Sequence, residues 1–287
     1  MSISAKDVKA LRDSTGAGMM DCKRALTEAE GDVERAMDVL RERGLAKAGK
    51  RAGRETSEGA VVFEAEGGRG VLIELGSETD FVANTPDFQS LAANIAKTIL
   101  AVGGEADLEA GLAATMDGGT VEDAVKAAGA KMGENIQLKR VAGVEVPGVV
   151  GGYIHGGGGL GVLLALETDA SGDEVDEVLR DLAMHVAAHD PTPLAIDRDG
   201  IPADVVEKER SFLTSQALES GKPENVVEKM VDGRINKFFA ENCLLEQKFV
   251  KDPDKSVRDL LADRSKAVGG ELKVARFVRF KRGEAAS

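Results

Sequence analysis

GVLIEL (70–75), followed by ETDF (78–81), recurs later in the chain as GVLLAL (161–166) followed by ETDA (167–170). Each copy follows another apolar run, at residues 60–65 or 149–154, across a glycine-rich break. Two apolar runs joined by such a break are typical of a β-hairpin. We therefore predict two related hairpins, an internal duplication inside an α+β core. The first copy ends with Phe81 where the second has Ala170.

A helical pattern follows each hairpin. Thr85 and Pro86 are typical of a helix start, and two shorter helices are expected near residues 105–115 and 120–132. The stripe that faces the core of the first helix consists of Phe88, Leu91, Ile95 and Ile99. The stripe after the second hairpin consists of Val175, Val178, Leu179, Leu182 and Val186.

The first 54 residues are predicted to form a separate module of three short helices, with a small excess of basic side chains. Ser4 and Asp7 are spaced as a capping box, and TGAG (15–18) breaks the chain. The second helix is expected from about Met20 to Glu28, and the third is expected to end at Gly44. The basic side chains of residues 47–54 then indicate a linker.

From about residue 203 the chain is again helical. GKP (221–223) stops one helix and starts the next, which predicts an antiparallel helical hairpin. Two helices cover each other poorly, so the flank of the hairpin is a candidate surface for a partner or for a second copy of the chain. A strand (244–250), a helix (257–268) and a strand (272–280) are expected to follow.

These patterns divide the chain into five segments. They are the helical module with its linker (1–54), the first core subdomain (55–142), the second core subdomain (143–202), the hairpin (203–240), and a return to the second subdomain with a short C-terminus (241–287).

The composition excludes several classes of protein. The net charge of −13 opposes binding along a nucleic-acid backbone, which needs clustered Lys and Arg. The longest apolar run, residues 160–166, is far shorter than the ~20 residues that span a bilayer. Two cysteines do not make a disulfide scaffold, and the N-terminus has no signal or transit pattern. We expect a soluble, cytoplasmic protein.

No catalytic or metal centre stands out. His185 and His189 have the spacing of two metal ligands on a helix, but no third ligand is near in the sequence, so a structural role is favoured. Cys22 beside a basic residue could be an activated thiol, but a packed small side chain is favoured. TGAG (15–18) and the glycines of 156–159 lack the context of a phosphate-binding loop. We expect no cofactor and no covalent chemistry.

Asp80 and Phe81 are the strongest candidates for function. They lie in a connection between a strand and a capped helix, where binding residues are common. Two interpretations of Phe81 are equally open from the pattern: it plugs the end of the sheet, or it is exposed and enters a partner. Burial of one exposed Phe side chain in a partner is worth ~1.5–3 kcal/mol.

At these residues the chain resembles the bacterial elongation factor Ts family, the exchange factors of elongation factor Tu. The specific motifs are LRDSTGAGMMDCKRAL (11–26) and ELGSETDFVAN (74–84). Supporting motifs, in the order of the family, are KMGEN (131–135), YIH (153–155), MHVAA (184–188), GKP (221–223) and KMVDGR (229–234). Together they span nearly the whole chain.

The resemblance implies a ubiquitin-associated-like helical module, two α+β core subdomains and a protruding helical hairpin. It implies that the loop Thr79 to Val82 meets the guanine-nucleotide domain of elongation factor Tu. There Phe81 would wedge between two helices, and Asp80 would help to move the segment that supports Mg²⁺. The other contacts that it implies are Val8, Leu11, Met19, Met20, Met132, Gly133 and His155. Several members continue into a further C-terminal helix, whereas this chain stops at residues 283–287.

Two alternatives remain open. The first is an interaction or holding protein that uses the helical hairpin, with the N-terminal module as a peptide-binding unit. It would need no Phe81 wedge and would ignore guanine nucleotides. The second is an enzyme that uses Cys22 or the histidines, and it would lose activity when these residues are replaced.

Overall fold

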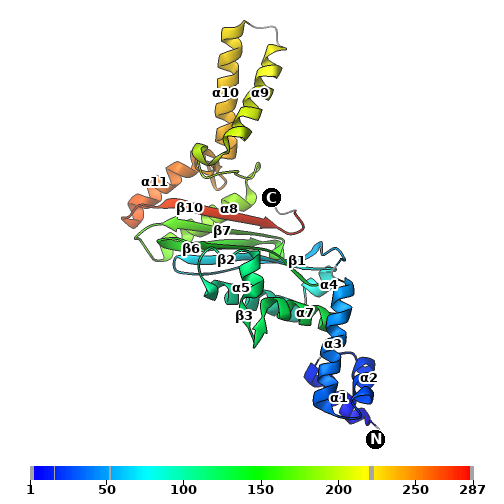
Figure 1. Cartoon of the computed structure of the whole chain (residues 1–287). Coiled ribbons are helices and arrows are strands. Elements are labelled where there is room, and N and C mark those ends of the chain that lie inside the picture. The colour runs from blue at the N-terminus through cyan, green and yellow to red at the C-terminus, as the bar shows by residue number, and fades with distance from the viewer. Residues whose placement is uncertain (1–2, 16, 52, 220–222, 285–287) are drawn as a thin grey trace.

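A computed structural model describes residues 3–15, 17–51, 53–219 and 223–284, with the backbone alone for residues 44–50. The molecule is elongated (Figure 1). Helices α1–α3 lie at one end, two β-sheets form the middle, and the hairpin of α9 and α10 projects at the other end. The fold is therefore of the α+β class, with antiparallel sheets and helices outside them.

The N-terminal helices form a small core of their own. They are α1 (Ala5–Thr15), α2 (Met19–Glu28) and α3 (Val33–Arg51). The predicted capping box is present, because the Asp7 carboxylate accepts hydrogen bonds from the backbone N–H and hydroxyl of Ser4. The shared core consists of Val8, Leu11, Cys22, Ala25, Leu26, Ala29 and Ala36. The predicted break at 15–18 includes residue 16, which lies outside the described residues.

The predicted end of the third helix at Gly44 is wrong. Helix α3 runs through Gly44 to Arg51, and the predicted linker is mostly helical. A glycine inside a helix costs only about 1 kcal/mol relative to Ala. The sequence beyond Gly44 is rich in Ala, Lys and Arg, which are strong helix formers. The Arg51 guanidinium also donates to the Gly129 carbonyl at 3.1 Å, which ties the end of α3 to α7.

The first sheet contains the first predicted hairpin and one strand that was not predicted. Strand β2 (Arg69–Ser77) lies between β1 (Glu58–Glu66) and β5 (Gln137–Glu145), all antiparallel. The outer face is covered by helices α5 (Pro86–Val102), α6 (Leu108–Ala113) and α7 (Val121–Met132). A short hairpin joins α6 to α7, and each of its strands, β3 (Thr115–Met116) and β4 (Gly119–Thr120), has two residues. Thr85 caps α5 as predicted.

The second sheet has the same arrangement of a hairpin followed by a helix. Strand β7 (Leu160–Glu167) lies between β6 (Gly148–His155) and β10 (Lys273–Lys281). Helices α8 (Asp173–Ala188) and α11 (Val257–Val268) pack on it. The strand predicted at 244–250 is mostly wrong: residues 244–246 form a 3-10 turn, and only β8 (Lys248–Phe249) pairs, with β9 (Asp252–Ser256).

The two sheets pack face to face. Alternate residues of β2 divide between the two sides: Ile73 packs toward α5, and Leu72 packs toward the second sheet. The glycine that opens each repeated motif permits this approach. A Cβ atom on Gly70 would lie 2.4 Å from Val150 Cγ1, and one on Gly161 would lie 2.5 Å from Val61 Cγ1. Both motifs therefore begin with Gly because the sheets leave no room for a side chain there.

The helical hairpin consists of α9 (Ala203–Leu218) and α10 (Glu224–Asn242). The two helices share a narrow apolar seam, formed by Leu213, Ala217, Val227, Val231 and Ile235. Residues 220–222 and 285–287 lie outside the described residues. In the part of the chain that the structure describes, every helix is too short or too polar to cross a membrane.

Candidate functional site

The segment predicted as a loop is one turn of helix. Helix α4 (Asp80–Ala83) follows β2 directly, and the Thr79 hydroxyl caps it by accepting from the Val82 N–H at 3.4 Å. Ala83 is buried and Val82 packs against the core of the first sheet, which anchors the inner side of the turn. Phe81 is on the outer side with 83% of its surface exposed, so it does not plug the sheet. Asp80 is also exposed.

Hydrogen bonds at both ends hold this turn. The Ser77 hydroxyl donates to the Thr79 carbonyl at 2.9 Å, before the turn. After it, the Asn84 amide donates to the Asp80 carbonyl at 2.9 Å, and the Thr85 hydroxyl donates to the Val82 carbonyl at 2.8 Å. An aromatic side chain that is exposed on a fixed turn needs little ordering when a partner covers it, which favours binding.

The turn after α7 lies beside α4. Gly133 ends α7 in the left-handed conformation, with φ of 81°, and Met132 packs partly against the first core. The next residue, Glu134, accepts from the Thr79 N–H at 3.1 Å and from its hydroxyl at 2.6 Å. The structure therefore brings Met132 and Gly133 into one hydrogen-bonded unit with the predicted loop. Glu134 itself was not singled out, because a lone carboxylate carries no pattern in the sequence.

A second carboxylate, that of Glu78, lies just before α4 and accepts a hydrogen bond from the turn after α7. Glu78 accepts from the Asn135 N–H at 2.6 Å, and that hydrogen bond, helped by the Arg54 guanidinium, lowers the pKa of the Glu78 carboxyl below its usual value. The Asn135 amide in turn donates to the Arg54 carbonyl at 2.8 Å. Three distant parts of the sequence therefore meet at the base of α4.

The N-terminal candidates separate into exposed and buried residues. Met19 and Met20 lie in the first turn of α2 and are 46% and 65% exposed. Val8 and Leu11 are only 8% and 1% exposed because they hold the three helices together. Their side chains offer almost no surface in the chain alone, so a contact of Val8 and Leu11 with a partner stays a prediction.

His155 lies at the end of β6. Its imidazole is exposed and its Nδ1 is 2.9 Å from the Tyr153 hydroxyl. The residues after it form a short 3-10 turn in which Gly158 lies against Ala60 of β1. The glycine loop at 156–159 is therefore a strand connection packed on the first sheet.

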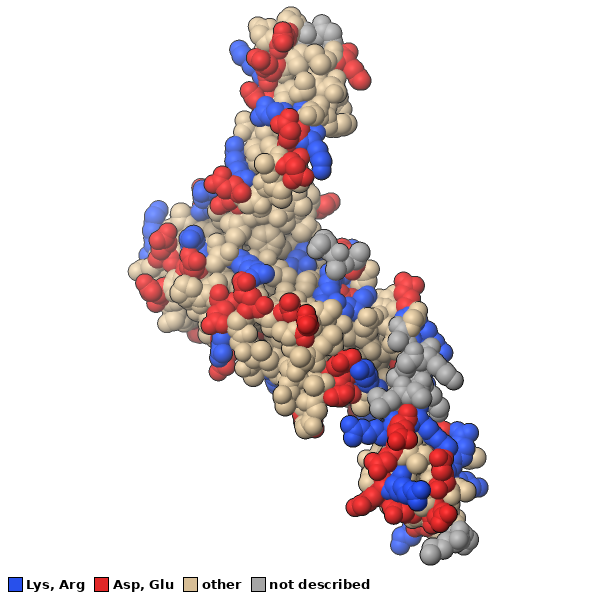
Figure 2. Space-filling model, in the orientation of Figure 1, with Lys and Arg blue, Asp and Glu red and all other residues tan. Residues whose placement is uncertain are grey.

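A cleft separates the N-terminal helices from the helices that cover the first sheet. Its volume is about 860 Å³, and its walls come from α2 and α3 on one side and from α5 and α7 on the other. Apolar, acidic and basic side chains line it, including Met37, Leu91, Met132, Asp21, Asp123, Arg41 and Lys131. On the face shown in Figure 2, acidic and basic side chains are interspersed, and both crowd the N-terminal helices.

The histidine and cysteine candidates have structural environments. His185 is buried, with Nε2 3.0 Å from Gln247 Oε1, and its Nδ1 accepts from the Val250 N–H at 3.3 Å. Burial lowers the pKa of His185 to about 4. Cys22 is fully buried, and burial raises the pKa of the Cys243 thiol to about 11. Within the described ranges, no three His, Cys, Asp or Glu side chains are grouped to hold a metal ion.

Known proteins match nearly the whole chain. The family model described as Elongation factor TS matches residues 78–284. Elongation factor Ts of Clostridioides difficile is 48% identical over 286 residues, which cover 99% of this chain and 93% of that protein. The proteins of the same name from Syntrophotalea carbinolica and Brucella ovis are 48% and 47% identical, and each match covers 99% of this chain and 94% of the relative.

The fold and the matches first define a class. This chain has an α+β fold with Phe81 exposed on the α4 turn, and it matches relatives named elongation factor Ts. It is therefore an elongation factor of protein biosynthesis. More particularly, it belongs to the elongation factor Ts family.

Proposed function

We propose that this protein is the guanine-nucleotide exchange factor of elongation factor Tu. In this proposal Phe81 drives exchange by inserting between elements of the partner. The observation behind this proposal is that Phe81 is 83% exposed on a turn that is fixed at both ends. A large apolar side chain held in water gains ~1.5–3 kcal/mol when a partner buries it. That free energy is available to open a gap between elements of the partner.

The nucleotide leaves because its Mg²⁺ is displaced. Mg²⁺ requires near-ideal octahedral coordination, so a small shift of the segment that supports it weakens its hold on the phosphates. We propose that exposed Asp80, adjacent to the wedge, promotes this shift in the partner. By linkage, if the factor lowers the affinity of the partner for nucleotide, nucleotide lowers the affinity of the partner for the factor by the same ratio. The factor therefore binds the GDP form, displaces GDP, and is released when GTP binds.

The other contacts are arranged around this wedge. Met132 and Gly133 belong to the same hydrogen-bonded unit as Phe81, through Glu134. Met19 and Met20 are exposed on the N-terminal helices, across the cleft from α7. We propose that these residues and His155 hold the nucleotide domain of the partner while Phe81 acts. No bond is made or broken in this mechanism.

The test is release of a fluorescent GDP analogue from elongation factor Tu, chased by excess GDP. We expect strong acceleration by substoichiometric amounts of this protein. We expect Phe81→Ala to slow it strongly while circular dichroism stays unchanged. Release at the uncatalysed rate with folded wild-type protein and active partner would overturn the function. Wild-type rates in Phe81→Ala would instead remove Phe81 from the mechanism.

A further inference from the structure

Two carboxylates join the α4 turn to the turn after α7 in a reciprocal way. Glu134 accepts two hydrogen bonds from Thr79, from its N–H at 3.1 Å and its hydroxyl at 2.6 Å. One residue before Thr79, Glu78 accepts from the N–H of Asn135, one residue after Glu134, at 2.6 Å. The two segments lie more than fifty residues apart in the chain, so the fold alone places them together.

We propose that Glu134 is a positioning residue for nucleotide exchange, acting through Thr79 on the direction of Phe81. This inference rests on the proposed function above. Thr79 uses its hydroxyl twice, as an acceptor for the Val82 N–H and as a donor to Glu134. The carboxylate therefore fixes the rotamer of the residue that caps α4. A helix of four residues has almost no stability of its own, so this anchor from a distant segment adds rigidity to the turn that presents Phe81.

The same carboxylate fixes the spacing between two contacts. Glu134 follows Met132 and Gly133, which we propose to touch the same partner domain as Phe81. Hydrogen bonds from Thr79 to Glu134 set the distance between the two contacts before the partner arrives. Such preorganisation reduces the ordering that binding would otherwise require. Loss of Glu134 is therefore expected to impair exchange although its side chain need not touch nucleotide.

The first experiment needs no partner. Amide hydrogen exchange is measured for residues 82–84 in wild type, Glu134→Ala and Glu134→Gln. The matched control is Glu109→Ala, at an exposed carboxylate on α6. We expect about tenfold faster exchange of these amides in Glu134→Ala. We expect a smaller change in Glu134→Gln, which keeps one acceptor oxygen, and none in Glu109→Ala. Unchanged protection in a folded Glu134→Ala protein would overturn the inference.

The second experiment tests whether Glu134 acts through Phe81. GDP release at saturating factor is expected to fall about tenfold in Glu134→Ala and less in Glu134→Gln. In a Phe81→Ala background, Glu134→Ala is expected to cause no further loss. An equal further loss would mean that Glu134 contributes on its own, contrary to the inference. If wild-type protein fails to accelerate release while the amide result holds, the proposed function fails and the positioning role of Glu134 in the fold stands.

Discussion

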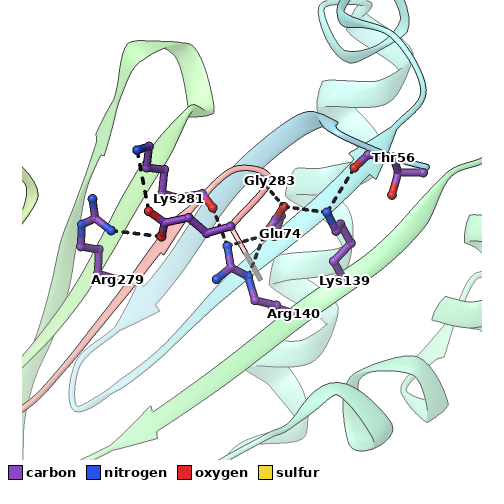
Figure 3. Close-up of polar contacts among 8 residues, drawn as sticks. Thr56, Glu74, Lys139, Arg140, Arg279, Lys281 and Gly283 are labelled. Carbon is purple, nitrogen blue, oxygen red and sulfur yellow. Dashed lines mark hydrogen bonds and ion pairs between the residues drawn. The ribbon is translucent and has the colours of Figure 1, made fainter. Parts of the chain in front are cut away.

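Arg140 donates from Nε to the Glu74 carboxylate at 2.6 Å, and the two side chains form a buried ion pair between the two sheets (Figure 3). Glu74 lies on the face of β2 that packs toward the second sheet, where an unpaired carboxylate would be costly. The N–H of Gly283 also donates to Glu74, and Arg140 donates to the Lys281 carbonyl at 2.7 Å. The Arg140 guanidinium lies 4.3 Å from the Phe280 ring centre. The pair thus joins the first sheet to the last strand.

Removal of Glu74 is expected to destabilise the core strongly. Glu74→Ala leaves Arg140, whose side chain is only 11% exposed, without its carboxylate partner, and frees the Gly283 N–H. Breaking a buried pair in this way costs about 3–5 kcal/mol. The measurement is the free energy of unfolding in urea. The control is Glu105→Ala, which breaks the exposed pair with Arg276 and should cost at most about 1 kcal/mol. Equal losses in the two variants would contradict the assigned role of the buried pair.

Two glycines should respond to alanine in opposite directions. At Gly70 the added Cβ would lie 2.4 Å from Val150 Cγ1, so Gly70→Ala is expected to cost about 1–3 kcal/mol by overpacking. Gly233 lies inside helix α10 with open space around its Cβ position. Gly233→Ala is therefore expected to stabilise the hairpin by about 0.5–1 kcal/mol. Thermal unfolding of both variants checks the signs, and a stabilising Gly70→Ala would mean that the sheets can separate freely.

The sequence predicted most of the fold because its signals were local. Both hairpins, the capped start of α5 and the helical hairpin follow from turn residues and apolar periodicity. Strand β5 was not predicted because it pairs with β2, which lies far from it in the sequence, and no tight turn joins the two strands. The helix end predicted at Gly44 is wrong because the helix formers beyond it outweigh one glycine. Phe81 was found by its place after a strand, but its exposure needed the packing of Val82 and Ala83 beneath it.

His185 is expected to make stability depend on pH. Its pKa is lowered from 6.5 to about 4, mainly by burial, so the folded protein keeps it neutral. Above pH 6.5 the imidazole is neutral in both the folded and the unfolded protein, and stability is at its full value. As the pH falls from 6.5 toward 4, the unfolded protein binds a proton that the folded protein does not, so the free energy of unfolding decreases. Between pH 7 and pH 5 the loss from this group is about 2 kcal/mol. Urea unfolding of wild type and His185→Gln at both pH values isolates it, since carboxylates titrate alike in both. Equal pH slopes would mean that His185 does not couple to folding.

Met20 should contribute to affinity more than to the rate of the exchange step. It is 65% exposed on the N-terminal helices, whereas Phe81 lies on the core. Met20→Ser is expected to raise the concentration of factor needed for half-maximal GDP release by about tenfold, with the saturated rate unchanged. Val33→Ser, a similar loss of apolar surface at a residue 48% exposed, serves as the control. A fall in the saturated rate would place Met20 in the exchange step itself.

The helical hairpin exposes two large apolar side chains, Phe212 and Leu218, at 61% and 59%. These side chains lie outside the seam between α9 and α10, so a second copy of the chain could cover them. We expect the wild-type chain to self-associate with rising concentration in sedimentation equilibrium, and Phe212→Ser to weaken this. The exchange assay run below the association range should be unaffected by that substitution, since Phe81 lies on the distant first sheet. A wild-type chain that stays monomeric at high concentration would leave the hairpin without a role in self-association.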